Sequence, residues 1–184
     1  MGCGEEGGLV PLLRDAGYDP LGADPAAPEE PGYRRERLED VDGEWDAVVA
    51  ARVLHHVHPL DDGIAHLASL APLLVVDEFA PDLIDSGAQE WYEGQHRMLA
   101  AAGADPPGPP SLVEWRARHT DLHPHGVLLA ALRTHYHERT LEWVPYFHRW
   151  LGGPSSEALE STLVGAGAFP AVGYRWVGVR RASR

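Results

Sequence analysis

Glycine residues at the very start of the chain constrain the fold more than any other feature. Gly2, Gly4 and Gly7 follow the spacing G-x-G-x-x-G, and an apolar helical pattern begins directly after them at Leu9. Such a loop needs glycine for a tight turn, for close approach of the backbone to a ligand, and for close packing of a helix on a strand. The spacing therefore predicts a nucleotide-binding loop in an α/β fold, with the strand that normally precedes the loop missing from the chain.

Helical and strand patterns alternate along the rest of the sequence. Short β-branched runs at 45–51 and 73–79 predict buried strands, which are typical of a parallel sheet covered on both faces. The order of elements predicts a single α/β domain over residues 1–184, with a Rossmann-like, doubly wound, mainly parallel sheet. Further extended segments are expected at 19–24, 33–38, 138–150 and 172–180, and helices at 7–17, 61–70 (capped by Asp61 or Asp62), 82–102, from Ser111 (a capping box with Glu114), 127–136 and from Ser155 or Ser156 to 165.

Residues 103–137 interrupt this alternation and predict an insertion, which is a candidate lid over a substrate site. Four prolines at 105–110 break the chain there. The histidines of the insertion have spacings that permit a metal site, a substrate-facing lid or plain solvent exposure. No cysteine or H-E-x-x-H pattern accompanies them, so we expect no metal. These histidines are His119, His123, His125, His135 and His137.

The charge of the chain limits its partners. The formal net charge is −13 and the sequence contains no lysine, which argues against nucleic acid because such binding depends on basic side chains that neutralise phosphates. No apolar run approaches the roughly 20 residues of a membrane span. Cys3 is the only cysteine, so no internal disulfide can form. We expect a cytoplasmic protein with a small-molecule partner, no membrane association and an undetermined oligomeric state.

Two ligands fit the glycine loop: a dinucleotide or S-adenosylmethionine. Asp24 lies 20 residues beyond Gly4 (24 − 4), at the end of an expected strand, where an acid can accept hydrogen bonds from both ribose hydroxyls of either ligand. Glu5 and Glu6 discriminate between the two, because carboxylates would oppose the charge of a pyrophosphate. S-adenosylmethionine carries an ammonium and a sulfonium group, so the two glutamates favour it.

The chain resembles class I S-adenosylmethionine-dependent methyltransferases, particularly the small "type 11"-like ones. This resemblance implies a sheet of about seven strands, the last one antiparallel, and covers nearly the whole chain outside 103–137. The matching segments are G-C-G-E-E-G-G at 2–8, G-A-D-P at 22–25, R-L-E-D at 37–40, W-D-A-V-V-A-A-R-V-L-H-H-V at 45–57, L-L-V-V-D-E-F at 73–79, and the closing helix and strand at 158–167 and 173–181.

The resemblance also implies a cofactor site, while the residues themselves indicate a base. His55 and His56 follow the strand at 45–51, and either could deprotonate an acceptor hydroxyl or amine. Asp77 and Glu78 end the next strand, and aromatic residues including Trp115, Tyr146 and Trp150 could line an acceptor pocket. By resemblance, the cofactor-binding residues would be Gly2, Cys3 and Gly4 at the methionine end, Asp24 at the ribose, Leu38 and Glu39 at the adenine, and Ala51 and Arg52 after the fourth strand.

The sequence thus predicts methyl transfer from S-adenosylmethionine to an unidentified small molecule. A nicotinamide-dependent oxidoreductase is an alternative with the same loop spacing. A degenerate, non-catalytic methyltransferase fold that acts as a binding partner is a second alternative, motivated by the missing first strand.

Overall fold

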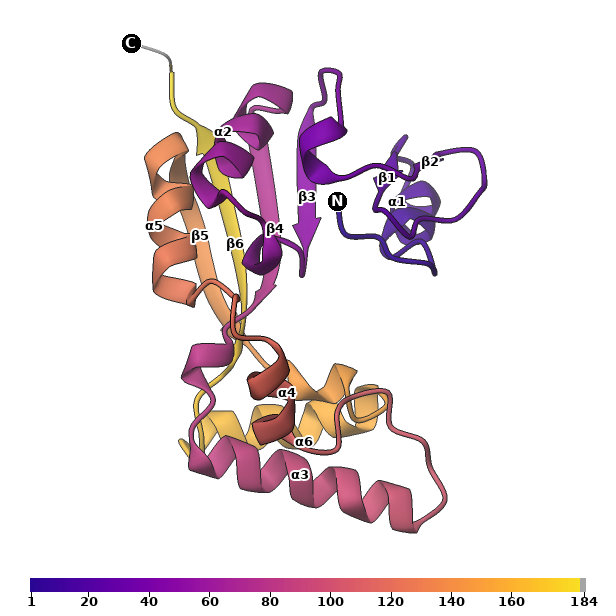
Figure 1. Cartoon of the computed structure of the whole chain (residues 1–184), viewed down its shortest axis with the longest axis vertical. Helices are drawn as coiled ribbons and strands as arrows, with labels where there is room; N and C mark the ends of the chain where they lie inside the picture. The colour runs from indigo at the N-terminus through magenta and orange to yellow at the C-terminus, as the bar shows by residue number, and fades with distance from the viewer. Residues whose placement is uncertain (183–184) are drawn as a thin grey trace.

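The computed structural model describes residues 1–182 as two sheets flanked by helices (Figure 1). The larger sheet has the strand order β3-β4-β6-β5. β4 is parallel to β3, and β6 is antiparallel to both of its neighbours, β4 and β5. The antiparallel last strand is therefore confirmed. The four strands are β3 (Ala47–Ala51), β4 (Leu73–Phe79), β5 (Tyr136–Val144) and β6 (Gly173–Arg180).

A second, two-stranded sheet lies beside β3. It pairs β1 (Gly22–Ala23) with β2 (Tyr33–Arg34) in parallel. Within residues 1–182 the chain thus forms six strands in two sheets, and the expected single sheet of about seven strands is wrong. Both small strands are shorter than the predicted segments at 19–24 and 33–38.

Met1 and Gly2 connect the two sheets. The amino nitrogen of Met1 donates to the carbonyl of Val49 (2.9 Å), and the N–H of Ala51 donates to the carbonyl of Met1 (3.1 Å). On the other side, the N–H of Gly2 donates to the carbonyl of Ala23 (3.0 Å). These two residues thus form backbone hydrogen bonds to both sheets, and Figure 1 marks the chain start between β3 and the β1–β2 pair. The glycine loop therefore leaves the sheet region at the carboxyl end of β3.

The main core lies between the larger sheet and the helices α2 (Leu60–Leu70) and α5 (His125–His135). Alternate β4 residues, Leu74 and Val76, are fully buried against these helices, as is Trp176 of β6. Each such side chain stabilises the fold by roughly 1.5–3 kcal/mol. Burial of alternate residues explains why short, strongly apolar runs predicted β3 and β4 correctly.

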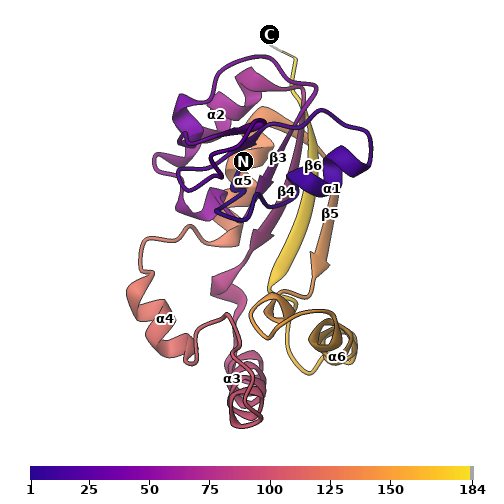
Figure 2. The same cartoon turned by 90° about the vertical axis from the view of Figure 1, so that its right-hand side faces the viewer.

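A second group of helices lies at the carboxyl ends of β3 and β4 (Figure 2). It contains α3 (Ser86–Ala101), α4 (Leu112–Arg118) and α6 (Pro154–Gly165), and the 3₁₀ turn η4 (Phe147–Arg149) precedes α6. A separate apolar cluster holds this group together around Phe79 at the end of β4. The short helix α1 (Val10–Asp15) follows the glycine loop. Helices and turns therefore surround the end of the sheet where the glycine loop also lies.

Two helices begin at or next to prolines, although the sequence predicted that aspartate would cap one of them and serine the other. Pro59 occupies the position before α2, so Asp61 and Asp62 lie in the first turn and neither caps the helix. Gly153 occupies the corresponding position of α6 with Pro154 next, so the serine caps expected there are also wrong. Proline fixes φ at a helical value and needs no partner for an N–H, so it starts a helix without a side-chain cap.

Other boundaries follow local hydrogen bonding. The Ser111 cap of α4 is confirmed, because its Oγ accepts from the N–H of Glu114 (3.3 Å). The helix expected at 82–102 begins later, at Ser86, because Asp85 caps it by accepting from the N–H of Ala88 (2.8 Å). The extended segment expected at 138–150 ends at Val144, where the chain turns into η4.

Candidate functional site

The glycine loop has the backbone conformation that its spacing predicted. Gly2, Gly4 and Gly7 all have positive φ values, of 74°, 59° and 78°, which side chains disfavour. A Cβ on Gly2 would collide with the carbonyl oxygen of Ala51, and one on Gly7 would collide with the hydroxyl of Tyr33. A Cβ on Gly4, in contrast, would meet no atom within 4 Å. The loop is thus pressed against β3 and β2, while the backbone at Gly4 borders open space.

Asp24 lies directly after β1 and close to the glycine loop. Its Oδ1 accepts from the N–H of Ala26 (2.8 Å), whereas its Oδ2 makes no hydrogen bond within residues 1–182. Burial and then the charge of Asp24 raise the pKa of the Cys3 thiol, so Cys3 stays protonated and is a poor nucleophile. The structure therefore brings Gly2, Cys3, Gly4 and Asp24 together, with one carboxylate oxygen of Asp24 available to a ligand.

The predicted adenine-flanking residues lie in the 3₁₀ turn η1 (Leu38–Asp40) and point in different directions. Leu38 is buried in the main core, beside Gly63 of α2. Glu39 is exposed and lies 3.4 Å from Arg37, with which it forms a surface ion pair. Leu38 thus contributes to packing in this structure, and Glu39 contributes to the solvent-facing surface.

Arg52 follows Ala51 at the end of β3 in a strained conformation. Its φ of 55° makes it the only residue other than glycine with a positive φ in the described part of the chain. Its N–H donates to the carbonyl of Asp77 (2.8 Å), which ties the turn to β4. The side chain is exposed and makes no ion pair among residues 1–182. Strained backbone of this kind is concentrated at functional sites.

His55 and Glu78 form a buried pair that the sequence analysis did not predict. The imidazole Nδ1 of His55 contacts Glu78 Oε2, and both side chains are almost completely buried, at 6% and 0% exposure. Glu78 also accepts from the N–H groups of Leu54 (2.7 Å) and Phe79 (3.0 Å). The second ring nitrogen of His55, Nε2, has no partner within the described residues and is not sealed from solvent. This is the arrangement of an oriented general base.

His56 and a turn of the 103–137 segment lie against the same loop. The centroid of the His56 ring lies 4.2 Å from that of His55, with the rings tilted by 42°. Burial, followed by the His55 charge, lowers the pKa of His56. The N–H of His123 donates to the carbonyl of His55 (3.1 Å), and its Nε2 lies 2.8 Å from the carbonyl of Val57. Within residues 1–182, no group of three or more histidine, cysteine or acidic side chains is arranged so that it could hold a metal ion.

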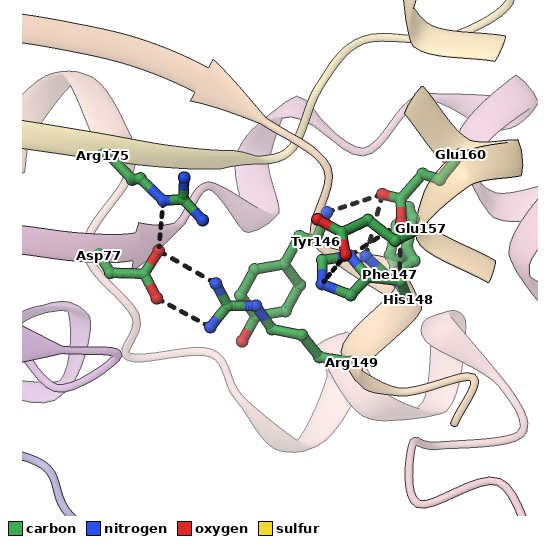
Figure 3. Close-up of polar contacts among 8 residues, drawn as sticks. All are labelled: Asp77, Tyr146, Phe147, His148, Arg149, Glu157, Glu160 and Arg175. Atoms are coloured by element: carbon green, nitrogen blue, oxygen red, sulfur yellow. Dashed lines mark hydrogen bonds and ion pairs between the residues drawn. The ribbon is translucent and has the colours of Figure 1, made fainter. Parts of the chain in front are cut away.

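Asp77, at the end of β4, forms an ion pair with η4 (Figure 3). Arg149 binds it with both guanidinium nitrogens, at 3.0 and 2.8 Å, and Arg175 of β6 lies 3.7 Å away. Bidentate pairs of this type fix geometry as well as charge. The turn η4 is thereby attached to the end of β4.

Glu160 of α6 fixes the same turn through its backbone (Figure 3). Its fully buried carboxylate accepts from three consecutive N–H groups, those of Tyr146 (2.7 Å), Phe147 (3.0 Å) and His148 (2.7 Å). In sequence, Glu160 is indistinguishable from the exposed acids of an amphipathic helix, so no local signal could have identified it. Its position determines where Tyr146 and Arg149 point.

Tyr146 brings an aromatic ring and a hydroxyl to this cluster. The ring stacks on Phe79, with 4.2 Å between centroids, and meets Trp150 edge-on at 5.3 Å. Burial raises the pKa of Tyr146 to about 12, although Arg52 opposes this rise. The phenol therefore remains protonated near neutral pH and can donate a hydrogen bond. Of the aromatic residues expected at an acceptor pocket, Tyr146, Trp150 and Trp115 gather around Phe79.

Two surface grooves lie away from the site described above. One of about 570 Å³ is lined by Leu83, Trp143 and Phe169, and another of about 480 Å³ lies between α2 and α5. Neither includes the glycine loop, Asp24 or the histidine pair. Among residues 1–182, every helix is too short or too polar to cross a bilayer.

Comparison with known proteins identifies the fold. No protein-family model matches the chain, and no curated protein sequence matches it. Solved methyltransferase structures do match. The magnesium protoporphyrin IX methyltransferase of Synechocystis PCC 6803, solved with bound SAH, is 19% identical with a TM-score of 0.54, over 98% of this chain and 72% of that one. An S-adenosylmethionine-dependent methyltransferase from Mesorhizobium loti is 18% identical with a TM-score of 0.56. The match covers 98% of this chain and 88% of the Mesorhizobium loti chain. The chain therefore has the Rossmann-like fold of these methyltransferases.

Proposed function

We propose that the chain binds S-adenosylmethionine and transfers its methyl group to a small molecule. The observation that supports this most directly is the meeting of the glycine loop with Asp24 at the carboxyl end of β3, on a fold shared with methyltransferases. In an open α/β sheet, ligands bind at this end of the strands.

The residues present fit the cofactor. The open space beside Gly4 allows a ligand to approach the backbone, and the unpaired Oδ2 of Asp24 can accept from ribose hydroxyls. Glu5 and Glu6 are exposed next to the loop. Their charge, together with that of Asp24, favours the cationic groups of S-adenosylmethionine over a pyrophosphate. These residues, with Gly2, Cys3, Ala51 and Arg52, would hold the cofactor.

His55 is the residue best placed to move a proton. When bound, the cofactor supplies a methyl group on a positively charged sulfur. We assign His55 Nε2 as the atom that takes the proton of the acceptor hydroxyl or amine. Glu78 would hold the ring in the tautomer with the proton on Nδ1, and would stabilise the imidazolium that forms. His56, with its lowered pKa, remains a second candidate base.

The segment at 103–137 supplies the proposed lid. His123, in the turn after α4, contacts the loop that holds His55, whereas the last part of the segment is α5, which covers the sheet. We propose that α4 and the turn after it close over the acceptor and exclude water, which a methyl transfer requires.

Isothermal titration calorimetry with S-adenosylhomocysteine tests the proposal. We expect micromolar binding by the 184-residue chain and a loss of about 10–100-fold in Asp24→Asn, because a hydrogen bond to a charged acceptor stabilises by about 1.5–3 kcal/mol. Asp19→Asn, an exposed acid just before β1, is the matched control and should bind normally. Absence of binding at millimolar ligand would refute the proposal, and binding of NADH instead would support an oxidoreductase.

A further inference from the structure

We propose that His123 is a positioning residue for His55, and that His58 and His123 together hold the proposed lid against the turn that carries the base. The inference rests on the proposed function and deepens it, because it names what attaches the lid to the end of the sheet where the site lies. We call these two side chains, with the carbonyls of Val57 and Asp121 that they contact, the histidine clasp.

Three hydrogen bonds connect the two segments of the clasp. The backbone N–H of His123 donates to the carbonyl of His55 (3.1 Å), and its ring Nε2 lies 2.8 Å from the carbonyl of Val57. In the reverse direction, Nε2 of His58 lies 2.9 Å from the carbonyl of Asp121. A carbonyl can only accept, so both rings carry a proton on Nε2. Each segment therefore donates to the other.

The two rings of the clasp also contact each other. The ring centroids of His58 and His123 lie 4.2 Å apart, with the planes tilted by 40°. Neither ring forms an ion pair within residues 1–182, so the clasp acts through hydrogen bonds and packing. The bond from His123 is half-buried, whereas the bond from His58 is exposed. Because water competes less for a half-buried donor, His123 contributes more to the clasp.

The turn η2 (Leu54–His56), which carries the base, is held at two places. Glu78 contacts the ring of His55 and accepts from the N–H of Leu54 (2.7 Å). The clasp instead binds the backbone, at the carbonyls of His55 and Val57. Glu78 fixes one ring nitrogen, and the clasp fixes the main chain from which the ring extends. The direction of Nε2, the atom assigned to take the proton, therefore depends on both.

The clasp lies where the proposed lid joins the core. Just beyond His123, Asp82 accepts from the N–H of His125 (3.0 Å), and its other carboxylate oxygen lies 2.7 Å from the His125 ring. Helix α5 begins there and packs in the main core. The lid therefore has a fixed end, and the clasp provides the contacts on the lid side of that end.

The other histidines near the clasp are engaged elsewhere. His119 lies with Nδ1 2.8 Å from the carbonyl of Trp115, and its ring stacks on the Trp115 ring. His125 is occupied by the carboxylate after β4. Within residues 1–182, His123 is thus the one histidine of the proposed lid segment that bonds to the turn of His55. The clasp gives this part of the histidine-rich pattern a role that needs no metal.

Nuclear magnetic resonance of protein labelled with ¹⁵N-histidine tests whether the clasp positions the base. Glu78 holds the proton of His55 on Nδ1, so the two ring nitrogens should give well-separated signals, which are assigned by their loss in His55→Gln. We expect His123→Ala to move these two signals toward each other, because a loosened ring exchanges between tautomers. His123→Gln, whose amide N–H can bond to the same carbonyl, should restore the wild-type separation.

Trypsin cleavage after Arg118, in α4, measures the attachment of the lid, because a helical bond is cut when the segment opens. We expect cleavage to be about three- to tenfold faster in His123→Ala, since the variant loses a half-buried hydrogen bond. His58→Ala loses an exposed bond and should accelerate cleavage about two- to threefold. Cleavage after Arg139 of β5, followed by mass spectrometry in the same digest, should not change.

His66→Ala is the matched control. Nε2 of His66 lies 2.9 Å from the carbonyl of Val41, so this variant loses the same kind of bond outside the clasp and should leave both readouts at their wild-type values. The inference is refuted if His123→Ala leaves the His55 signals unchanged, even with faster cleavage, because the lid then detaches without moving the base. It is also refuted if His123→Gln behaves like His123→Ala while circular dichroism shows an intact fold.

Calorimetry with S-adenosylhomocysteine separates the clasp from the proposed function. The glycine loop does not contact the clasp, so the clasp variants should bind this ligand as the wild type does. Normal binding together with unchanged His55 signals in His123→Ala would refute the clasp and leave the proposed function standing. Absence of binding by the wild type would refute the proposed function, and with it the role of His55 that the clasp serves.

Discussion

Glu160 is expected to be among the most important single side chains for stability. Replacing it with glutamine removes the negative charge and turns an amide N–H₂ toward backbone N–H donors that have no other acceptor. Each buried donor left unpaired costs about 1–3 kcal/mol, and the amide oxygen can satisfy only part of the set. We therefore expect Glu160→Gln to lower the free energy of unfolding by about 3–5 kcal/mol, or the melting temperature by roughly 6–20 °C for a chain of this size.

Urea denaturation followed by circular dichroism measures this loss. Glu157→Gln is the matched control on the same helix, because its carboxylate is 47% exposed and lies 4.0 Å from the His148 ring. An exposed pair of this kind contributes less than about 1 kcal/mol. If Glu160→Gln and Glu157→Gln both lose less than about 1 kcal/mol, the assignment of Glu160 as the anchor of η4 is wrong.

Two other predictions concern the glycine loop and the histidines. Gly2→Ala should lower the free energy of unfolding by about 2–3 kcal/mol and abolish S-adenosylhomocysteine binding, because the added Cβ collides with the Ala51 carbonyl. Gly4→Ala introduces no such collision, so urea denaturation should show a loss of only about 1–2 kcal/mol. The pKa of His56 is lowered below its ordinary 6.5, so His56 contributes stability above that pH and loses it as the pH falls. His56→Asn should therefore show a shallower loss of melting temperature between pH 7 and 5 than the wild type, and equal slopes would contradict this.

Local sequence patterns were sufficient where a segment's structure depends on its own residues. The strand at 73–79 was predicted with its observed bounds, because a short apolar run of this kind has few alternatives in a sheet. The glycine loop was predicted because only glycine adopts its φ values without strain. The small strands β1 and β2 were predicted too long, since they have few hydrogen-bonding partners to extend them.

Contacts between distant segments could not be predicted from these patterns. The partners of Glu78 are Leu54 and His55, 24 and 23 residues away, and Arg149 reaches Asp77 across 72 positions. An acid at a strand end or on a helix has the same local signature whether it faces solvent or a buried donor. Only the assembled fold shows which acids are buried, and the same holds for the free state of Arg52.

Three carboxylates organise the end of the sheet, each by binding a different segment. Glu78 holds the turn after β3, and with it His55, while Asp77 and Glu160 hold η4 from two sides. Because Asp77 binds a side chain of η4 and Glu160 binds its backbone, the position of Tyr146 depends on both. Some of the acids behind the net charge of −13 therefore hold loops and turns in place. The exposed acids beside the glycine loop, Glu5 and Glu6, are the ones that can attract a cationic cofactor.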